Sequence, residues 1–171
     1  VALGHWLFTA GFFATRPFAV VVVVVLPLDL DQFQRGGVKL GFDPFAKDLP
    51  PYVERVELET IWRESDAISL HCPLTPENAK LINRQTLAAC KRGVIIVNTA
   101  RGGLIDEAAL LDAVRSGQVA SAGLDSFAVE PMTAPHPFHG EARITLSPHI
   151  GGVTADAYVK MGVAAAQNAL A

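Results

Sequence analysis

Cysteine and positive charge are both scarce in this chain of 171 residues. The two cysteines, Cys72 and Cys90, cannot build the disulfide framework of a small secreted domain, so we expect free thiols and a cytoplasmic protein. Lysine and arginine number 14 against 17 acids, which sets the net charge at −3 and the isoelectric point near 5.9. This balance argues against a nucleic-acid partner that is held by bulk positive charge.

Apolar residues, by contrast, are plentiful. Half of the chain is hydrophobic and 18% is charged, which excludes a disordered protein and supplies a core. The length allows one domain, or two small ones. The 14 glycines and 11 prolines predict many short turns. A first residue of Val1 in place of methionine is typical of a processed, trimmed or incomplete chain.

The first 30 residues almost lack charge. They contain one arginine, Arg16, and an uninterrupted run of six valines from Val20 to Val25. A membrane-spanning helix needs about 20 apolar residues. Here Arg16-Pro17 divides the stretch, and β-branched valine favours a strand. No basic segment precedes it, as a signal peptide requires. We therefore expect a buried strand and no membrane segment.

The rest of the chain alternates between apolar strands and helical patterns. We expect strands at 38–42, 67–70, 94–97, 119–124 and 143–146. We expect helices at 58–65 and 86–90, a third that Asp106 caps and Gly117 ends, and a last one from the cap Thr154 to Leu170. Strands that are apolar on both faces and alternate with helices predict an α/β fold, with a doubly wound parallel sheet covered on both sides.

Small polar clusters follow the expected strands at the points where they end. These clusters are Asp43, His71, the stretch from Asn98 to Arg101, Asp125 and His149. In an open parallel sheet, ligands bind outside the carboxyl ends of the strands. The sequence therefore predicts a ligand cleft, lined by Asp43, Thr99, Arg101, Asp125, Glu130 and His149.

Each of these residues has an ordinary interpretation and a functional one. Asp43 before Pro44 is either a turn residue or an acid that binds the ribose hydroxyls of a dinucleotide, which favours NAD over NADP. Arg101 is either a surface arginine or a planar donor for a substrate carboxylate. A lone His149 is most often structural, but pairing with Glu130 makes it a candidate acid and base. A neighbouring carboxylate fixes the tautomer of an imidazole and raises its pKa toward neutrality.

Other histidines and the thiols offer weaker sites. His136 and His139 lie three positions apart in a proline-rich loop with no cysteine nearby, so we expect no metal site there. Cys72, beside a strand end, is expected to be a packed neutral thiol.

Five ordered motifs make the sequence recognisable. They occupy 41–44, 65–75, 97–106, 124–131 and 147–152, and include G-F-D-P, N-T-A-R-G-G and S-P-H-I-G-G. Residues 38–170 resemble the nucleotide-binding domain of the D-isomer-specific 2-hydroxyacid dehydrogenases. The resemblance implies a Rossmann-like fold over residues 1–171, NAD as cofactor, hydride transfer with a small 2-hydroxy or 2-oxo acid, and a homodimer.

The resemblance also implies residue roles. Arg101 is similar to the arginine that binds substrate, His149 to the acid that protonates the carbonyl oxygen, and Glu130 to its carboxylate partner. Asp43 is similar to the acid that binds the adenosine ribose. The implied cofactor-binding set is Asp43, His71, Pro73, Thr75, Thr99, Ala100, Asp125, Gly151 and Gly152, with Asp125 on the carboxamide and the two glycines against the nicotinamide.

The sequence departs from the family pattern in residues 1–37. No G-x-G-x-x-G phosphate loop occurs there, and 26–37 is short for a crossover helix. Either the chain lacks the phosphate cradle and binds NAD poorly, or residues 1–37 are not the genuine sequence; six identical valines favour the second explanation.

The family's substrate domain is also absent from the sequence. Two alternatives to the dehydrogenase therefore stay open. One is a dinucleotide-sensing binding module of the corepressor type, and the other is a fragment without activity of its own.

Overall fold

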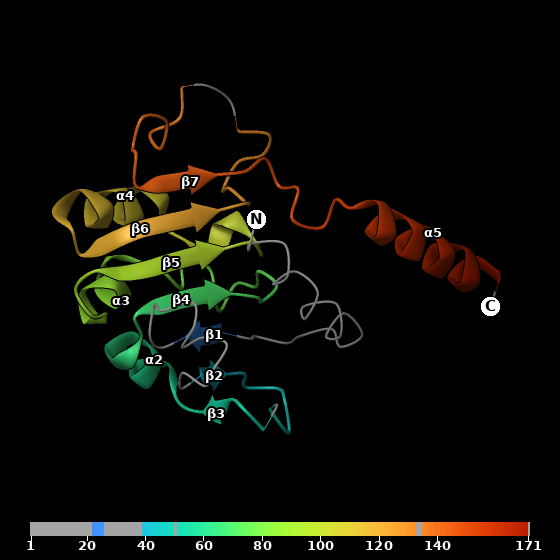
Figure 1. Ribbon diagram of the computed structural model, residues 1–171, viewed down its shortest axis with the longest axis horizontal. Helices are drawn as coiled ribbons and strands as arrows, with labels where there is room; N and C mark the ends of the chain where they lie inside the picture. Colours follow the sequence, from blue (N-terminus) through green and yellow to red (C-terminus); the bar gives the residue numbers. More distant parts are fainter. Residues whose placement is uncertain (1–21, 26–38, 50, 133–134, 171) are drawn as a thin grey trace.

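A computed structural model describes residues 22–25, 39–49, 51–132 and 135–170, and it contains a seven-stranded sheet with helices packed against it (Figure 1). The order of the strands across the sheet is β3-β2-β1-β4-β5-β6-β7. The strands are β1 (Val22–Val25), β2 (Lys39–Phe42), β3 (Glu54–Arg55), β4 (Ala67–Leu70), β5 (Val94–Asn98), β6 (Val119–Leu124) and β7 (Ile144–Leu146). The helices are α2 (Leu58–Glu64), α3 (Arg84–Ala89), α4 (Glu107–Ser116) and α5 (Ala155–Leu170), with a 3₁₀ turn, η3 (Gly102–Leu104).

The predicted α/β fold is confirmed, and most neighbouring strands run in parallel. β2 pairs with β3, and β4, β5, β6 and β7 pair in succession, all in parallel. β4 and β6 have the predicted bounds, and the other predicted strands differ from the observed ones by one residue at an end. The two-residue β3 was not predicted, because two exposed charged residues carry no strand pattern.

β1 departs from the parallel arrangement. The valine run forms the predicted strand at Val22–Val25, but it pairs antiparallel with both β2 and β4. The sheet therefore departs at β1 from the all-parallel order that the sequence predicted. The expectation that 1–37 lacks a phosphate loop lies outside the described residues, apart from β1 itself.

Helices α2, α3 and α4 pack side by side against the sheet and close its core. Ile61 and Trp62 of α2 and Leu110 and Val114 of α4 are buried with the apolar residues of β4–β6. α4 begins and ends as predicted. The Asp106 carboxylate accepts the Ala109 amide at 3.1 Å, and Gly117 follows the helix with a φ of 75°. Such a cap contributes about 1 kcal/mol, and the left-handed turn favours glycine.

α3 begins two residues before its predicted start. The side chain of Asn83 accepts the amides of Gln85 and Thr86, and Thr86 returns a bond to the Asn83 amide. This reciprocal cap satisfies amides that the helix leaves unpaired, so the helix begins where the cap is available.

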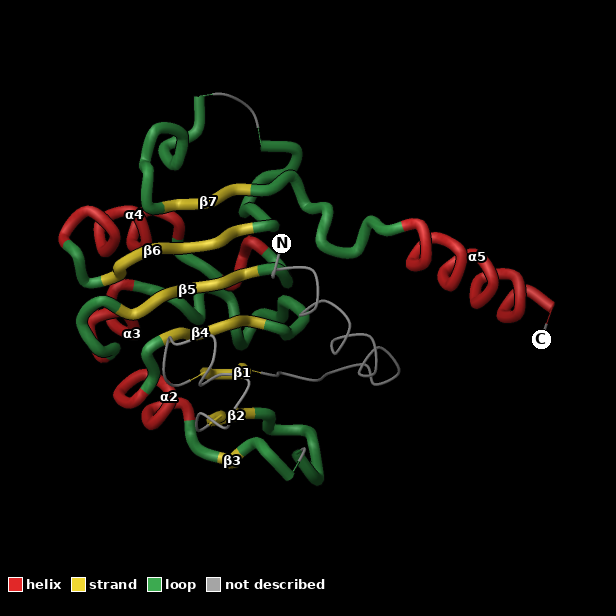
Figure 2. The backbone as a smooth tube through the Cα atoms, in the orientation of Figure 1, coloured by secondary structure: helices red, strands yellow, loops and turns green. Residues whose placement is uncertain are grey.

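α5 extends away from the sheet (Figures 1 and 2). It begins at the predicted place, where the Thr154 hydroxyl accepts the Ala157 amide at 3.1 Å. Its large apolar side chains are exposed; they are Tyr158, Val159, Met161 and Val163. Within the described part of the chain, no helix is both long and apolar enough to cross a membrane.

Candidate functional site

The carboxyl ends of the parallel strands lie at one edge of the sheet, where the arrowheads of β4, β5, β6 and β7 point the same way (Figure 1). β1 runs antiparallel to both β2 and β4, so β2 and β4 point the same way, and β5, β6 and β7 follow β4. The topology therefore brings the predicted clusters to this edge, although they are far apart in the sequence. The residues that follow these strands are Asp43, His71, Thr99 to Arg101, Asp125 and His149.

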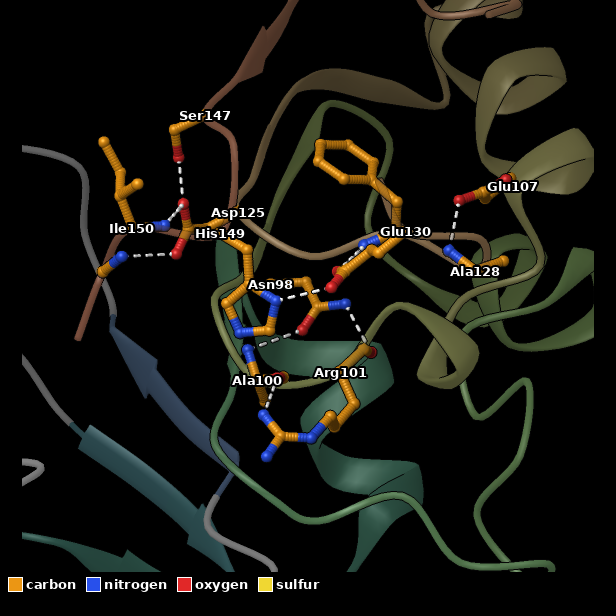
Figure 3. Close-up of polar contacts among 12 residues, drawn as sticks. Asn98, Ala100, Arg101, Glu107, Asp125, Ala128, Glu130, Ser147, His149 and Ile150 are labelled. Atoms are coloured by element: carbon orange, nitrogen blue, oxygen red, sulfur yellow. Dashed lines mark hydrogen bonds and ion pairs between the residues drawn. The ribbon is translucent and has the colours of Figure 1, made fainter. Parts of the chain in front are cut away.

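Glu130 and His149 form the pair that the sequence predicted (Figure 3). Nδ1 of His149 lies 2.7 Å from Oε2 of Glu130. The other carboxylate oxygen, Oε1, accepts the Phe127 amide at 2.8 Å. The hydrogen bonds from His149 and Phe127 hold the pKa of Glu130 below its ordinary value, so the carboxylate is charged at neutral pH. Because a charged carboxylate only accepts hydrogen bonds, Nδ1 of His149 carries the proton.

Asp125 anchors the loop that presents His149. Its Oδ1 accepts the Ser147 hydroxyl and the Ile150 amide at 3.0 Å, and its Oδ2 accepts the Gly151 amide at 2.7 Å. Burial pushes the pKa of Asp125 upward, but these three hydrogen bonds outweigh burial and the pKa is lowered. His149 itself has a φ of 54°, a left-handed conformation that costs an L-residue about 1 kcal/mol. The Asp125 carboxylate holds the turn in that conformation.

The loop of Arg101 is organised by Asn98, whose side chain is completely buried. The Asn98 amide group donates to the Arg101 carbonyl at 2.9 Å, and its oxygen accepts the Ala100 amide at 3.0 Å. The guanidinium of Arg101 is exposed and donates to the Ala100 carbonyl at 2.7 Å. Thr99 is exposed beside it. Arg101 therefore presents an exposed guanidinium at the same edge as Glu130 and His149.

Asp43 ends β2 in a turn that it holds itself. Its Oδ1 accepts the amides of Phe45 and Ala46 at 2.9 and 3.0 Å. The guanidinium of Arg55 donates to the carbonyls of Asp43 and Ala46 at 2.7 and 2.6 Å. Asp43 is therefore the turn residue that the ordinary interpretation predicted. Both contacts use one carboxylate oxygen, and Asp43 is only 1% exposed, so its ribose-binding role stays a prediction.

His71 begins the loop after β4, and Asn78 ties this loop together. Asn78 accepts the Thr75 amide at 2.7 Å and donates to the Pro73 carbonyl at 2.8 Å. Nε2 of His71 lies 2.8 Å from the Ser69 hydroxyl. Desolvation by the surrounding atoms lowers the pKa of His71, so the ring is neutral at neutral pH.

Sequence reasoning missed how four residues organise the site: Asn78, Asn98, Glu107 and Ser147. The sequence placed Asn98 and Ser147 at or just beyond strand ends, but it did not predict which groups their side chains bind. Glu107 had no usable signal, since an acid in the first turn of a helix is common for electrostatic reasons alone. Its Oε1 accepts the Ala128 amide at 2.9 Å.

His136 and His139 contact each other, and His136 also faces the first turn of α4. Nδ1 of His139 accepts the His136 amide at 3.2 Å, and Nε2 of His136 faces Glu107 at 3.5 Å. In the described ranges, no three potential ligand side chains come together.

The described residues leave room for a dinucleotide at its nicotinamide end. At the adenosine end, Asp43 follows β2 but is only 1% exposed. At the other end, a side chain added at Gly152 would meet no atom within 4 Å, so the backbone of the 147–152 loop is open to close approach. The oxygens of Asp125 are already engaged by the loop, so a bond to the carboxamide would share or replace one of these contacts. The diphosphate cradle, expected after β1, lies outside the described residues.

Comparison with known proteins agrees with this geometry. Residues 36–151 match the model of the family "D-isomer specific 2-hydroxyacid dehydrogenase, NAD binding domain". The chain is 43% identical over 136 residues to D-3-phosphoglycerate dehydrogenase of Mycobacterium tuberculosis, covering 78% of this chain and 26% of that protein. It is 47% identical over 130 residues to hydroxypyruvate reductase of Thermotoga maritima, covering 74% and 42%.

A solved structure of D-2-hydroxyisocaproate dehydrogenase matches with a TM-score of 0.72 and 31% identity, over 80% of this chain and 46% of that one. The chain thus spans less than half the length of these relatives.

Proposed function

The chain belongs to the family of D-isomer specific 2-hydroxyacid dehydrogenases, whose NAD binding domain it contains, and we propose that it is the cofactor domain of an enzyme that interconverts a D-2-hydroxy acid and its 2-oxo acid. The observation that carries the proposal is the contact of Glu130 with His149 at the edge where Arg101 is exposed. An acid–base pair beside a carboxylate-binding group is what the reduction of a 2-oxo acid requires.

His149 is the group that exchanges the proton. Its Nδ1 is bound to Glu130, so Nε2 is the nitrogen left to face a substrate oxygen. In the direction of reduction, Nε2–H gives its proton to the carbonyl oxygen as that oxygen gains charge. In the direction of oxidation, Nε2 takes the hydroxyl proton. Glu130 stays charged in both directions, and it keeps the ring oriented and stabilises the imidazolium form.

Arg101 is the group that holds the substrate. Its planar guanidinium can donate two parallel hydrogen bonds to a carboxylate, which all 2-hydroxy and 2-oxo acids share. The buried Asn98 fixes the loop and so directs this side chain toward the edge of the sheet. The side chain of the substrate would be selected elsewhere, since the described residues at this edge are those that meet the carboxylate and the reacting carbon.

NAD bound at this edge would supply the hydride acceptor or donor. Asp43 would hold the adenosine ribose, and its negative charge would repel a 2′-phosphate, which favours NAD over NADP. Thr99, Ala100, Asp125, Gly151 and Gly152 would lie near the nicotinamide end. His71, Pro73 and Thr75 would border the adenosine and diphosphate. These assignments are supported by the positions of the residues, which all follow the ends of β4, β5, β6 or β7.

The proposal extends to the whole chain and its assembly. The family model matches 36–151, and we assign the rest of residues 1–171 to the same domain. A homodimer follows from the family resemblance, and a cytoplasmic location follows from the two free, buried cysteines.

Site variants in the full-length enzyme test the function. Oxidation of NADH is followed with a panel of 2-oxo acids for the wild type, His149→Ala, Arg101→Ala and the control His139→Ala. We expect the first two variants to lose about 10²- to 10⁴-fold in turnover and the control to lose nothing. Wild-type rates in His149→Ala and Arg101→Ala would refute the assignment. NADH binding without turnover of any 2-oxo acid would favour a dinucleotide-sensing module instead.

A further inference from the structure

Glu107 touches the loop that carries Glu130, although it belongs to a different element. It is the first residue of α4, and its Oε1 accepts the Ala128 amide at 2.9 Å (Figure 3). Its Oε2 lies 3.5 Å from Nε2 of His136, further along the same connection between β6 and β7. One carboxylate thus contacts two separate parts of this connection.

The ring of His136, which faces Glu107, has a fixed orientation. Nδ1 of His136 accepts the Phe138 amide at 3.3 Å, so the neutral ring carries its proton on Nε2 and presents it to Glu107. The ring of His136 also packs edge-on to Phe127, with the ring centres 6.2 Å apart. The two carboxylate oxygens of Glu107 thus face different groups, Oε1 the Ala128 amide and Oε2 the His136 ring.

The amide next to the one that Glu107 binds is part of the proton-handling pair. The Phe127 amide donates to Oε1 of Glu130, and Oε2 of Glu130 binds His149. Two consecutive amides, of Phe127 and Ala128, are thus held by two carboxylates. Gly102 packs closely against the same peptide, because a side-chain atom added at Gly102 would lie 1.9 Å from the Phe127 carbonyl carbon and 2.4 Å from the Ala128 nitrogen.

We propose that Glu107 is a positioning residue for Glu130 and His149, which acts by fixing the backbone of residues 127–130 through the Ala128 amide. The proposal rests on the proposed function in one respect, the assignment of proton transfer to that pair. The proposal predicts that the backbone of residues 127–130 stays in place as long as the side chain at position 107 is long enough to accept the Ala128 amide. The charge of that side chain is not required. The competing role is electrostatic, since an acid in the first turn of a helix interacts favourably with the helix dipole.

Three substitutions separate reach from charge. Glu107→Gln keeps the length and an acceptor oxygen but removes the charge. Glu107→Asp keeps the charge in the first turn of α4 but is one methylene too short to reach the amide. Glu107→Ala removes both. The control is Asp112→Ala, which breaks another ion pair of α4, the 2.6 Å contact with Arg84 on α3.

Two measurements on this chain report on the pair without any substrate. One is the hydrogen-exchange rate of the Phe127 amide, which Glu107 does not touch. The other is the pKa of Glu130, followed by ¹³C NMR of its carboxyl carbon. We expect Phe127 to exchange about tenfold faster in the Asp and Ala variants, and at the wild-type rate in the Gln variant and the control.

The sign of the change in Glu130 adds a second criterion. Loss of its bonds to Phe127 and His149 raises the pKa of Glu130, whereas removal of a nearby negative charge alone lowers it. Positioning therefore predicts a raised pKa in the Asp and Ala variants. The proposal is overturned if Glu107→Gln gives the exchange rate and the pKa of Glu107→Ala while Glu107→Asp gives those of the wild type, because Glu107 then acts through its charge. Unchanged exchange and titration in folded Glu107→Asp would overturn it as well.

These readouts do not depend on catalysis. A chain without dehydrogenase activity but with the predicted exchange pattern would contradict the proposed function and leave the positioning role intact. The converse result would contradict only the positioning role. It is an active enzyme in which substitutions of Glu107 change neither the exchange of the Phe127 amide nor the pKa of Glu130.

Discussion

Nδ1 of His149 lies 2.7 Å from Oε2 of Glu130, although the two residues are 19 positions apart in the chain. Each partner is held by its own loop. The Phe127 amide binds the far oxygen of Glu130, and Asp125 binds the amides of Ile150 and Gly151 just after His149. The pair is therefore assembled before any ligand arrives, which reduces the reorganisation that proton transfer requires.

Removal of the imidazole should change the titration of its partner. The hydrogen bond from His149 is the main reason why the pKa of Glu130 is lowered, so His149→Ala should raise that pKa toward its ordinary value of 4.5. The pKa of Glu130 is measured by ¹³C NMR of its carboxyl carbon in a titration over about 5 pH units around that value. His139→Ala is the matched control, since this histidine has no contact with Glu130. An unchanged titration in His149→Ala would show that the contact is absent in solution.

The same pair should make stability depend on pH in one direction. Because the folded-state pKa of Glu130 is depressed, its contribution is present above the unfolded value near 4.5 and is lost as the pH falls through the folded value. Unfolding by urea is measured at several pH values for the wild type and Glu130→Gln. We expect the difference between them to be constant at neutral pH and to shrink below about 4.5. A difference that grows on acidification would have the wrong sign.

Gly102 should tolerate no side chain. A Cβ there would lie 1.9 Å from the carbonyl carbon of Phe127 and 2.1 Å from its oxygen, and both are backbone atoms that cannot rotate away. Gly102→Ala should therefore cost about 3 kcal/mol or more. Gly123→Ala is the control, because a Cβ at Gly123 meets nothing within 4 Å, and it should change stability by about 0.5 kcal/mol at most. Equal denaturation midpoints for the two variants would contradict the close approach.

Asp125 should hold the His149 loop through the three hydrogen bonds that its carboxylate accepts. Asp125→Ala leaves the donors of Ser147, Ile150 and Gly151 without their acceptor, and we expect a loss of about 3 kcal/mol. Ser147→Ala removes only one of these bonds and should cost about 1 kcal/mol. Hydrogen exchange at Ile150 and Gly151 checks the mechanism, since both amides should exchange faster in Asp125→Ala. Protected amides in that variant would mean that the loop has another anchor.

Much of the fold could be predicted from the sequence, because the local sequence patterns favour the same helices and strands that the packed structure contains. Asp106 and Gly117 bound α4 by cap chemistry that depends on a few neighbouring residues. The strands of the parallel part are short apolar runs, and the rule that ligands meet their carboxyl ends placed His149 and Glu130 together. The bounds of helices and strands were predicted correctly where the local sequence strongly favours one conformation, as at the cap residue Asp106 and at Gly117.

The orientation of β1 was not readable for a related reason. A run of identical valines presents the same side chain on both faces and at every position, so its sequence specifies neither register nor direction. The roles of Asn98 and Glu107 were also not readable, because each acts on a backbone group that only the folded chain brings near. Such contacts leave no periodicity in the sequence.

The thiols should be inert in the native chain. Burial raises the pKa of both Cys72 and Cys90 to about 11, and the Cys90 thiol donates to the Thr86 carbonyl at 3.2 Å. At pH 7 only about one thiol in ten thousand would be a thiolate, which is the reactive form. Alkylation by iodoacetamide, followed by mass spectrometry, should therefore be slow for the folded chain and fast in urea. Both side chains are almost fully buried, so access limits the reaction as well. Labelling of the folded chain at the unfolded rate would contradict both the burial and the raised pKa.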